Sequence, residues 1–460
     1  GSIAGAIGGS GSVAAGASIA ANYIGTSGNP HQVQAYIQDA RVVSGGGPIG
    51  ILAQSDAIIK SISAKGDAAG RIAVNGAVSI NWMYTDIAAF VKGSTSGDES
   101  KLIQAYGDIS LDAIDNTAIS VIAGNIAGAG TVGVGAAVSV IFIGSGSLEN
   151  GDPAYNNHNV AQDEVGSSSP STDFSYDQPA FNDSAKVRAF IENSLVESTH
   201  GSVAATATAN AVIFNISAGA GVGGTAGIQG SVSVNYLYNE VAAYMINAEV
   251  DAAQNITLEV LTLKRTSIPQ SALQAGTVEG EATSFDGGAE DEGDESCLEI
   301  DANSPDTLTS IQAIAGAVAG GGAAGVGAAI AVNHLENIYS AYIIGATLTA
   351  GGDITIRSAD QAGIETVSAA AAVSGTFAGA GSVSLNFIEN HILSYISGST
   401  ATAANLNLLA LDDSTIKSVS GQVNFSGAAG LGAAAAYNEI SNIIKTYIQD
   451  YDHDNNESTP

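Results

Sequence analysis

Acidic side chains near the end of the chain could coordinate a divalent cation. The segment places aspartates at alternating positions, Asp450, Asp452 and Asp454, and Glu457 follows them. This order resembles the opening of a calcium-binding loop, in which carboxylate oxygens at alternate positions surround the ion. The sixth position, where such loops need glycine for a sharp turn, is Asn455. Calcium bound by Asp450, Asp452, Asp454 and Glu457 is therefore one expectation, and a solvated acidic loop is the other.

The other residues that could carry out catalysis do not form a recognisable set. His334 and His391 lie beside Asn333 and Asn390, two asparagines that recur along the chain, so we interpret both histidines as part of the repeated sequence pattern. The sequence contains no metal-ligand spacing, nucleophile elbow or phosphate-binding loop. Paired carboxylates can cleave glycosidic bonds, so a β-helical polysaccharide-acting enzyme stays open as an alternative. We nevertheless expect that the protein is not an enzyme.

The composition favours repeated, closely packed strands. The chain has 460 residues, with 57 Gly, 8 Pro and 1 Trp, and small side chains bury little area in a single globular core. Its 13 Lys and Arg against 45 Asp and Glu give a formal net charge of −32, which argues against nucleic-acid binding. Cys297 is the only cysteine, so no disulfide forms within the chain.

Long apolar stretches such as residues 202–239 and 310–333 exceed the length of a membrane span. They are rich in Gly and Ala, and their Gly-Gly pairs disfavour helix. The run from Gly230 to Asn235 alternates small or polar residues with valine, which is typical of a β-strand. We therefore interpret these stretches as strands.

One short motif recurs along the chain: Ala, Ser or Thr, then an aromatic residue, then Ile, Val or Met. Tyr36 and Phe90 are 54 positions apart, Tyr395 and Tyr447 are 52 apart, and two longer gaps contain insertions. The aromatic residues of the motif are Tyr36, Phe90, Phe190, Tyr244, Tyr342, Tyr395 and Tyr447. The pattern predicts seven repeats of 52–54 residues.

An asparagine precedes the aromatic residue by nine positions in five repeats: Asn81, Asn235, Asn333, Asn386 and Asn438. The third repeat has Ile141 there, and the first has Asn22 followed by a short insertion. Stacked asparagines hydrogen-bond between neighbouring strands and stabilise cross-β arrangements. We expect one column of asparagines and one column of aromatic residues that fill the core or a groove. Both columns would be structural ladders.

Short strands separated by turn residues, without a helical period, predict an all-β protein, and the repeats predict a parallel β-solenoid, or β-helix. Strands such as Ile354 to Ile356 alternate aliphatic with polar residues, and we expect the aliphatic side to face the core. We also expect each repeat to form two coils of about 26 residues, which gives about 14 coils and a rod of roughly 65 Å.

The fullest repeat, from Gly325 to Ile356, contains Gly-Val-Gly-Ala-Ala-Ile-Ala-Val-Asn, then Ala-Tyr-Ile, then Gly-Gly-Asp-Ile-Thr-Ile. It resembles the repeat of the leukotoxin-like filamentous adhesins, which are giant secreted bacterial proteins, and more loosely that of filamentous haemagglutinins. The resemblance covers nearly the whole chain except two insertions. It implies a β-helical stalk, export to the bacterial cell surface, and adhesion or filament formation. It implies no catalytic residue.

Two acidic insertions divide the chain. We expect β-solenoid repeats at residues 1–144, 185–264 and 308–460, and loop insertions at 145–184 and 265–307. Such loops carry recognition or are solvated decoration. This organisation predicts a structural or adhesive segment of an extracellular protein, whose partners are further copies or repeats of itself, or cell-surface glycans or proteins. An outer-membrane β-barrel is a further alternative.

The first and last repeats contain apolar runs without a polar cover, such as residues 3–21. Bare strand edges invite pairing with another strand. We therefore expect more of the same chain, or another copy, against each end of the stack.

Overall fold

The computed structural model describes residues 1–26, 29–93, 102–144, 186–262 and 310–449. Every helix or strand in these ranges is a β-strand, and the ladders that join the strands are parallel. The described part of the chain is therefore all-β and built from parallel sheets. It contains no helix that is long and apolar enough to cross a membrane.

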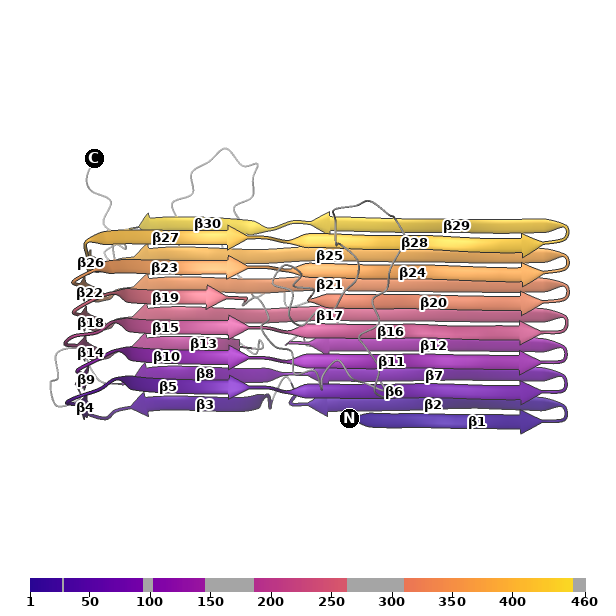
Figure 1. Ribbon diagram of the computed structural model, residues 1–460, viewed down its shortest axis with the longest axis horizontal. Helices are drawn as coiled ribbons and strands as arrows, with labels where there is room; N and C mark the ends of the chain where they lie inside the picture. The colour runs from indigo at the N-terminus through magenta and orange to yellow at the C-terminus, as the bar shows by residue number, and fades with distance from the viewer. Residues whose placement is uncertain (27–28, 94–101, 145–185, 263–309, 450–460) are drawn as a thin grey trace, which may run out of the picture.

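The strands form four sheets (Figure 1). The seven-strand sheet contains β1 (Ser2–Ser10), β6 (Ile58–Ala69), β11 (Ala118–Ala129), β16 (Val212–Gly223), β20 (Ile311–Gly321), β24 (Gly363–Ser374) and β28 (Thr415–Ser426). The eleven-strand sheet contains β2 (Val13–Ile24), β3 (His31–Gln38), β7 (Ile72–Met83), β8 (Thr85–Lys92), β12 (Val132–Ile143), β13 (Lys186–Glu192), β17 (Ala226–Ile246), β21 (Ala324–Ile344), β25 (Phe377–Ser397), β29 (Ala429–Ile440) and β30 (Ile443–Gln449).

The other two sheets are smaller. The six-strand sheet contains β5 (Ile49–Ser55), β10 (Ile109–Asp115), β15 (Val203–Ala209), β19 (Ile256–Leu261), β23 (Asp353–Asp360) and β27 (Asn405–Asp412). The end sheet contains β4 (Val42–Ser44), β9 (Ile103–Ala105), β14 (Leu195–Ser198), β18 (Glu249–Ala252), β22 (Thr347–Ala350) and β26 (Thr400–Thr402).

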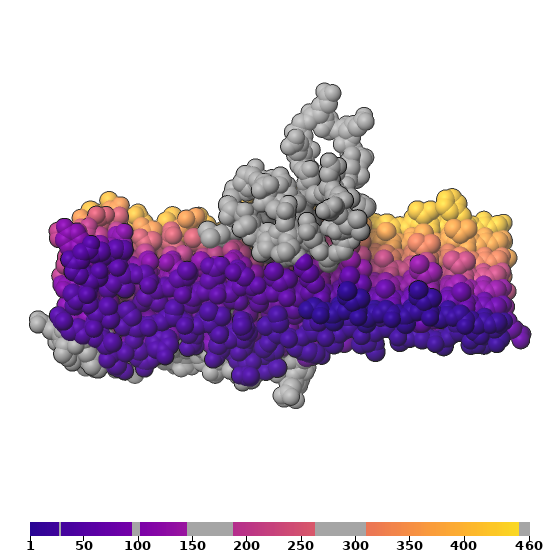
Figure 2. All heavy atoms as spheres, turned by 60° about the horizontal axis from the view of Figure 1, so that its bottom comes forward, coloured from indigo at the N-terminus to yellow at the C-terminus, as the bar shows by residue number. Residues whose placement is uncertain are grey.

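The chain passes through the sheets in a constant order. From β6 it reverses into β7, continues through β8, turns at β9 and returns along β10 (Figure 1). We call one such circuit a rung. The next rung begins with β11, which pairs with β6. The rungs stack in chain order, as the colours from indigo to yellow show in Figure 2.

One sequence repeat forms one whole rung. Tyr36 pairs with Phe90, and Asn333 pairs with Asn386, each one repeat later. The expected division into two coils of about 26 residues, and with it the 65 Å rod, is therefore wrong. A rung is a flattened loop whose longest strands have 21 residues, so it uses the complete repeat. Seven rungs span roughly 30 Å at the usual strand spacing, and the longest dimension lies along the strands (Figure 1).

One half of each rung encloses an aliphatic core. We call this half the aliphatic lobe; it consists of the six-strand sheet, the end sheet, β3, β8, β13, β30 and the second halves of β17, β21 and β25. Inward residues such as Ile109, Ile256 and Ile354 stack in its core. The alternate positions, such as Asp112 and Thr206, face outward. In this lobe the aliphatic side of the strands faces inward, as the sequence pattern predicts.

The other half of each rung has the opposite arrangement. We call it the glycine-rich lobe; it consists of the seven-strand sheet, β2, β7, β12, β29 and the first halves of β17, β21 and β25. In β17, Ser233 and Asn235 are buried inside the lobe, whereas Val232 and Val234 point outward. The expectation that aliphatic residues face the core is therefore wrong for most of this lobe, and it holds where residues such as Ile119, Ile213 and Leu335 form a buried apolar cluster beside the aliphatic lobe.

Close approach of the two sheets explains this reversal. Gly221 of β16 points into the glycine-rich lobe, where a Cβ atom on it would lie 2.3 Å from the carbonyl oxygen of Ile228. A Cβ on Gly133 would lie 2.3 Å from the carbonyl oxygen of Val222. Branched side chains do not fit into such a space, so the interior there consists mainly of Gly, Ala, Ser and Asn, and buried aliphatic residues of this lobe gather at its other end, beside the aliphatic lobe.

Candidate functional site

A column of asparagine side chains runs through the interior of the glycine-rich lobe. Each Nδ2 donates to the Oδ1 of the next rung: Asn22 to Asn81 at 2.7 Å, Asn235 to Asn333 at 2.7 Å, Asn333 to Asn386 at 2.7 Å, and Asn386 to Asn438 at 2.8 Å. The structure thus places the five asparagines of the repeat, together with Asn22, in one column. Strand pairing places Ile141 between Asn81 and Asn235.

The opposing seven-strand sheet supplies further partners to this column. Asn215 donates to Asn235 at 2.6 Å, and Thr366 donates to Asn386 at 2.7 Å. In the rung of Ile141, the corresponding position of the seven-strand sheet is Val121, and both side chains belong to one buried apolar cluster. A polar pair has therefore been replaced by an apolar pair in that rung.

The seven aromatic residues of the repeat form a second column. Successive rings from Tyr36 through Phe90, Phe190, Tyr244, Tyr342 and Tyr395 to Tyr447 are stacked, with centroids 4.7–5.1 Å apart and planes within 9° of parallel. Ala341 and Ile343 belong to the aliphatic core, so Tyr342 between them points to the opposite side of the sheet. The aromatic column therefore lies on the outer side of the eleven-strand sheet and not in the aliphatic core.

Left-handed residues mark the corner after this aromatic strand, a feature that was not predicted from the sequence. The third residue after the aromatic has positive φ in six rungs: Asp39, Gly93, Asn193, Asn247, Gly345 and Gly398. Asp, Asn and Gly are the residue types that adopt this conformation most readily. The recurrence of these three types at one position was the available signal. In the sequence, Asp450 has the same position relative to Tyr447.

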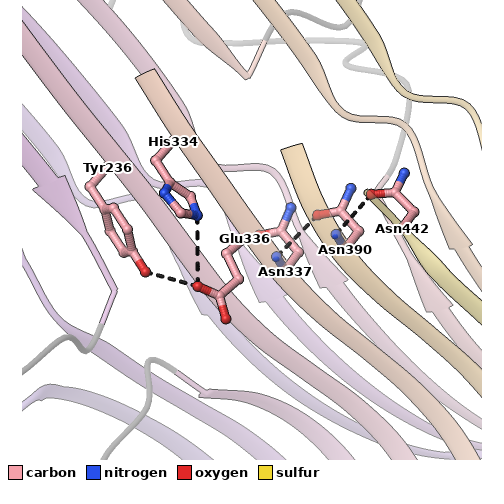
Figure 3. Close-up of polar contacts among 6 residues, drawn as sticks. All are labelled: Tyr236, His334, Glu336, Asn337, Asn390 and Asn442. Atoms are coloured by element: carbon pink, nitrogen blue, oxygen red, sulfur yellow. Dashed lines mark hydrogen bonds and ion pairs between the residues drawn. The ribbon is translucent and has the colours of Figure 1, made fainter. Parts of the chain in front are cut away.

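A polar cluster lies on the outer face of the eleven-strand sheet, where the ring of Tyr236 stacks on Phe142 and contacts the ring of His334 (Figure 3). Tyr236 donates to Oε2 of Glu336 at 2.9 Å, and Nε2 of His334 lies 3.9 Å from the same oxygen. Burial lowers the pKa of His334, which Glu389 opposes, and burial raises the pKa of Glu336. Burial, and then the charge of Glu336, raise the pKa of Tyr236. The cluster therefore favours a neutral histidine and a tyrosine that keeps its proton.

A second asparagine ladder lies where the two lobes meet. The backbone N–H of Asn337 donates to Oδ1 of Asn390 at 3.0 Å, and that of Asn390 donates to Oδ1 of Asn442 at 2.8 Å (Figure 3). Nδ2 of Asn390 also donates to Oδ2 of the buried Asp360 at 2.6 Å. Burial raises the pKa of Asp360 to about 7, an effect that the nearby Asp412 increases and the hydrogen bond from Thr262 opposes.

Several predicted features lie outside the described residues. They are the predicted calcium ligands Asp450, Asp452, Asp454 and Glu457, and both insertions, at 145–184 and 265–307. Within the described ranges, no three His, Cys, Asp or Glu side chains gather in a way that could bind a metal ion.

Comparison of the chain with models of known protein families, with curated proteins and with solved structures finds no match. Function is therefore inferred from the arrangement of the described residues, in which polar and aromatic columns connect each rung to the next.

Proposed function

We propose that this chain is a structural or adhesive segment of a large bacterial cell-surface or filament-forming protein, built as a parallel β-solenoid of seven repeats. The observation that carries the proposal is the continuity of the aromatic column from Tyr36 to Tyr447. Its repetition makes each rung depend on its neighbours, as in other stacked-repeat proteins. Such a stack can extend without a globular core and without disulfides.

An extracellular location accords with this architecture. The net charge of −32 favours solubility in an open medium. The resemblance of the repeat to leukotoxin-like filamentous adhesins supports the same location and an adhesive role. Cell-surface glycans or proteins are the proposed targets of adhesion.

Further copies or further repeats of the same protein are the proposed partners of the terminal rungs. Apolar side chains whose partners in the next rung are buried are exposed there, for example Tyr36 in β3 and Ile448 in β30. One edge of each terminal rung has no hydrogen-bonded strand beside it among the described residues. Another rung on either edge would continue the parallel ladders and cover these side chains.

Immunogold electron microscopy of the source cells would test the proposal. Antibodies raised against this chain should label fibres or a layer outside the cell envelope. Labelling that is confined to the cytoplasm would reject both the location and the scaffold role. Beads coated with the chain should in addition adhere to cells, and beads coated with the heat-denatured chain provide the control.

The adhesive part of the proposal has its own test. Deleting residues 148–183 should leave the β-sheet circular dichroism unchanged and reduce the adhesion of coated beads. An unfolded deletion variant would mean that this insertion is structural, and unchanged adhesion would mean that recognition lies elsewhere on the molecule.

A further inference from the structure

The outer face of the seven-strand sheet carries an apolar surface across all seven rungs. Four neighbouring columns of its outward positions contain only Ile, Val, Ala, Gly and Phe, and a further outward column at the start of the strands contains polar residues such as Lys60, Gln312 and Glu365. The first column runs from Ile3 through Ile216 to Val419, and the second, from Gly5 through Ala218 to Gly421, contains only Gly and Ala. We call these four columns the apolar face.

The large side chains of this face are exposed even in the middle of the stack. Ile126 is 64% exposed, Val222 and Val318 are each 50% exposed, and Val373 is 51% exposed. These residues belong to the third to sixth rungs, so their exposure is not an effect of the terminal rungs. The neighbouring outer face of the six-strand sheet instead carries polar residues such as Thr206. A continuous exposed apolar area of this kind marks an interaction surface.

The arrangement of large and small side chains on the apolar face indicates what covers it. In the third column, large and small residues alternate through all seven rungs, and in the fourth column they alternate from Gly128 to Val373. Ile126 is followed along its strand by Gly128, and Val318 by Gly320, whereas the intervening rung has Ala220 followed by Val222. Side chains that protrude therefore alternate with hollows. A second face with the same pattern, displaced by one rung, would place its protruding side chains in these hollows.

The size and charge of the face are suited to a second copy. Seven strands about 4.8 Å apart, each contributing eight residues at about 3.3 Å, give a footprint of about 900 Å². A stable interface needs about 800 Å² from each partner. The chain carries a net charge of −32, yet these four columns contain no charged side chain. Contact between two such faces therefore brings no like charges together at its centre.

We propose that the apolar faces of two copies pack against each other, sheet on sheet, and join two stacks side by side. This lateral contact is separate from the terminal rungs and goes beyond the proposed scaffold function. A lipid surface is a poorer occupant, because the chain has 13 Lys and Arg against 45 Asp and Glu and anionic headgroups would repel it.

The mass of the complete chain in solution tests the proposal. Analytical ultracentrifugation should show the monomer of 45.6 kDa at low concentration and at least twice that mass at high concentration. Val318→Lys should remain monomeric across the same range, because the dimer would bury a charge at its centre. Val318 has alanine neighbours in both adjacent rungs, Ala220 and Ala371, so the variant should keep the wild-type circular dichroism.

Thr206→Lys is the matched control. It adds the same charge to an outward position of the six-strand sheet, between Asp112 and Glu259, and should associate like the wild type. A wild-type chain that is monomeric at all concentrations would overturn the proposal. Association that persists in Val318→Lys would also overturn it and assign the contact to the terminal rungs. Co-sedimentation of a monomeric wild type with phosphatidylcholine vesicles would assign the face to lipid instead.

Discussion

Asn333 donates from Nδ2 to Oδ1 of Asn386 in the next rung, at 2.7 Å. The same Nδ2 donates to Oγ1 of Thr366 in the opposing sheet, also at 2.7 Å, and Asn235 donates to Oδ1 of Asn333. An amide nitrogen carries two hydrogens, so these two hydrogen bonds use both of them. One buried side chain therefore joins three rungs along the stack and two sheets across it.

Replacement of this amide should destabilise the stack. Asn333→Leu removes the acceptor of Asn235 and the donor to Asn386, and both partners stay buried. We expect a loss of about 1–3 kcal/mol in the free energy of unfolding, because unsatisfied buried polar groups are costly. The measurement is the urea dependence of the β-sheet circular dichroism. Asn407→Leu, on the exposed outer face of β27, should leave the midpoint nearly unchanged, and equal effects of the two substitutions would contradict a role for the column.

The aromatic column should stabilise the fold through the packing of its rings. Phe190 is 5% exposed, and its ring stacks on Phe90 and Tyr244 with centroids 4.7 Å away on each side. Phe190→Ala should cost about 3–5 kcal/mol, because it leaves a cavity between two rings. Phe190→Tyr retains the ring, as the neighbouring rungs do, and should cost much less. The same urea titration measures both variants, and a stability for Phe190→Ala equal to that of wild type would show that the column does not stabilise the fold.

The nine-residue spacing between the asparagine and the aromatic residue of a repeat shows which faces of the strand the two side chains occupy. Asn333 and Tyr342 lie on one unbroken strand, β21, and nine is an odd number. Successive side chains of a strand alternate between its faces, so an odd offset places the two residues on opposite sides. The asparagine faces the interior and the aromatic residue faces out. We expected the aromatic residues to fill the core or a groove, and this parity excludes the aliphatic core, although the rings form a buried cluster of their own.

The reversal of the glycine-rich lobe was harder to foresee. A run such as Val232, Ser233, Val234 has a period of two whichever side faces inward, and aliphatic burial is the usual outcome. The deciding feature is the partner strand, where Gly219, Gly221 and Gly223 all point inward. Period alone does not show which strands face each other across a sheet pair, so the close approach became visible only in the structure. The prediction of two coils per repeat was wrong for the same reason, because the sequence period does not show which strands face each other within one rung.

Substitution of an inward glycine should destabilise the fold, whereas substitution of an outward glycine should be tolerated. A Cβ on Gly219 would lie 2.0 Å from Oδ1 of Asn125 and 2.2 Å from Nε2 of Gln229, two side chains that hydrogen-bond to each other. Gly219→Ala should separate them and cost about 1–3 kcal/mol. Gly230 points outward, with nothing within 4 Å of a Cβ, so Gly230→Ala should be neutral or slightly stabilising. Thermal unfolding of the two variants gives the comparison, and an equally harmful Gly230→Ala would mean that strand glycines matter for another reason.

The buried Asp360 should make stability depend on pH. Burial raises its pKa to about 7 in the folded chain, against about 3.9 for an aspartate in an unfolded one. Between these values the folded state retains a proton that the unfolded state has lost, so stability falls as the pH rises from about 4 to about 7. The fall reaches on the order of 4 kcal/mol and then levels off, because above pH 7 both states are ionised.

Asp360→Asn isolates this contribution, because the amide resembles the protonated acid in size and is neutral at every pH. Hydrogen bonds from Thr262 and Asn390 end on the Asp360 oxygens, so the amide loses one favourable contact and should be somewhat less stable than wild type at pH 4. Between pH 4 and pH 7 the difference should shrink and then change sign, because the wild type must ionise a buried group and the variant does not. Asp413→Asn, at an exposed neighbour of Asp412, should keep the wild-type pH profile. The measurement is the urea midpoint of all three proteins across this pH range, and parallel profiles for wild type and Asp360→Asn would show that Asp360 ionises in the folded chain as it does in the unfolded one.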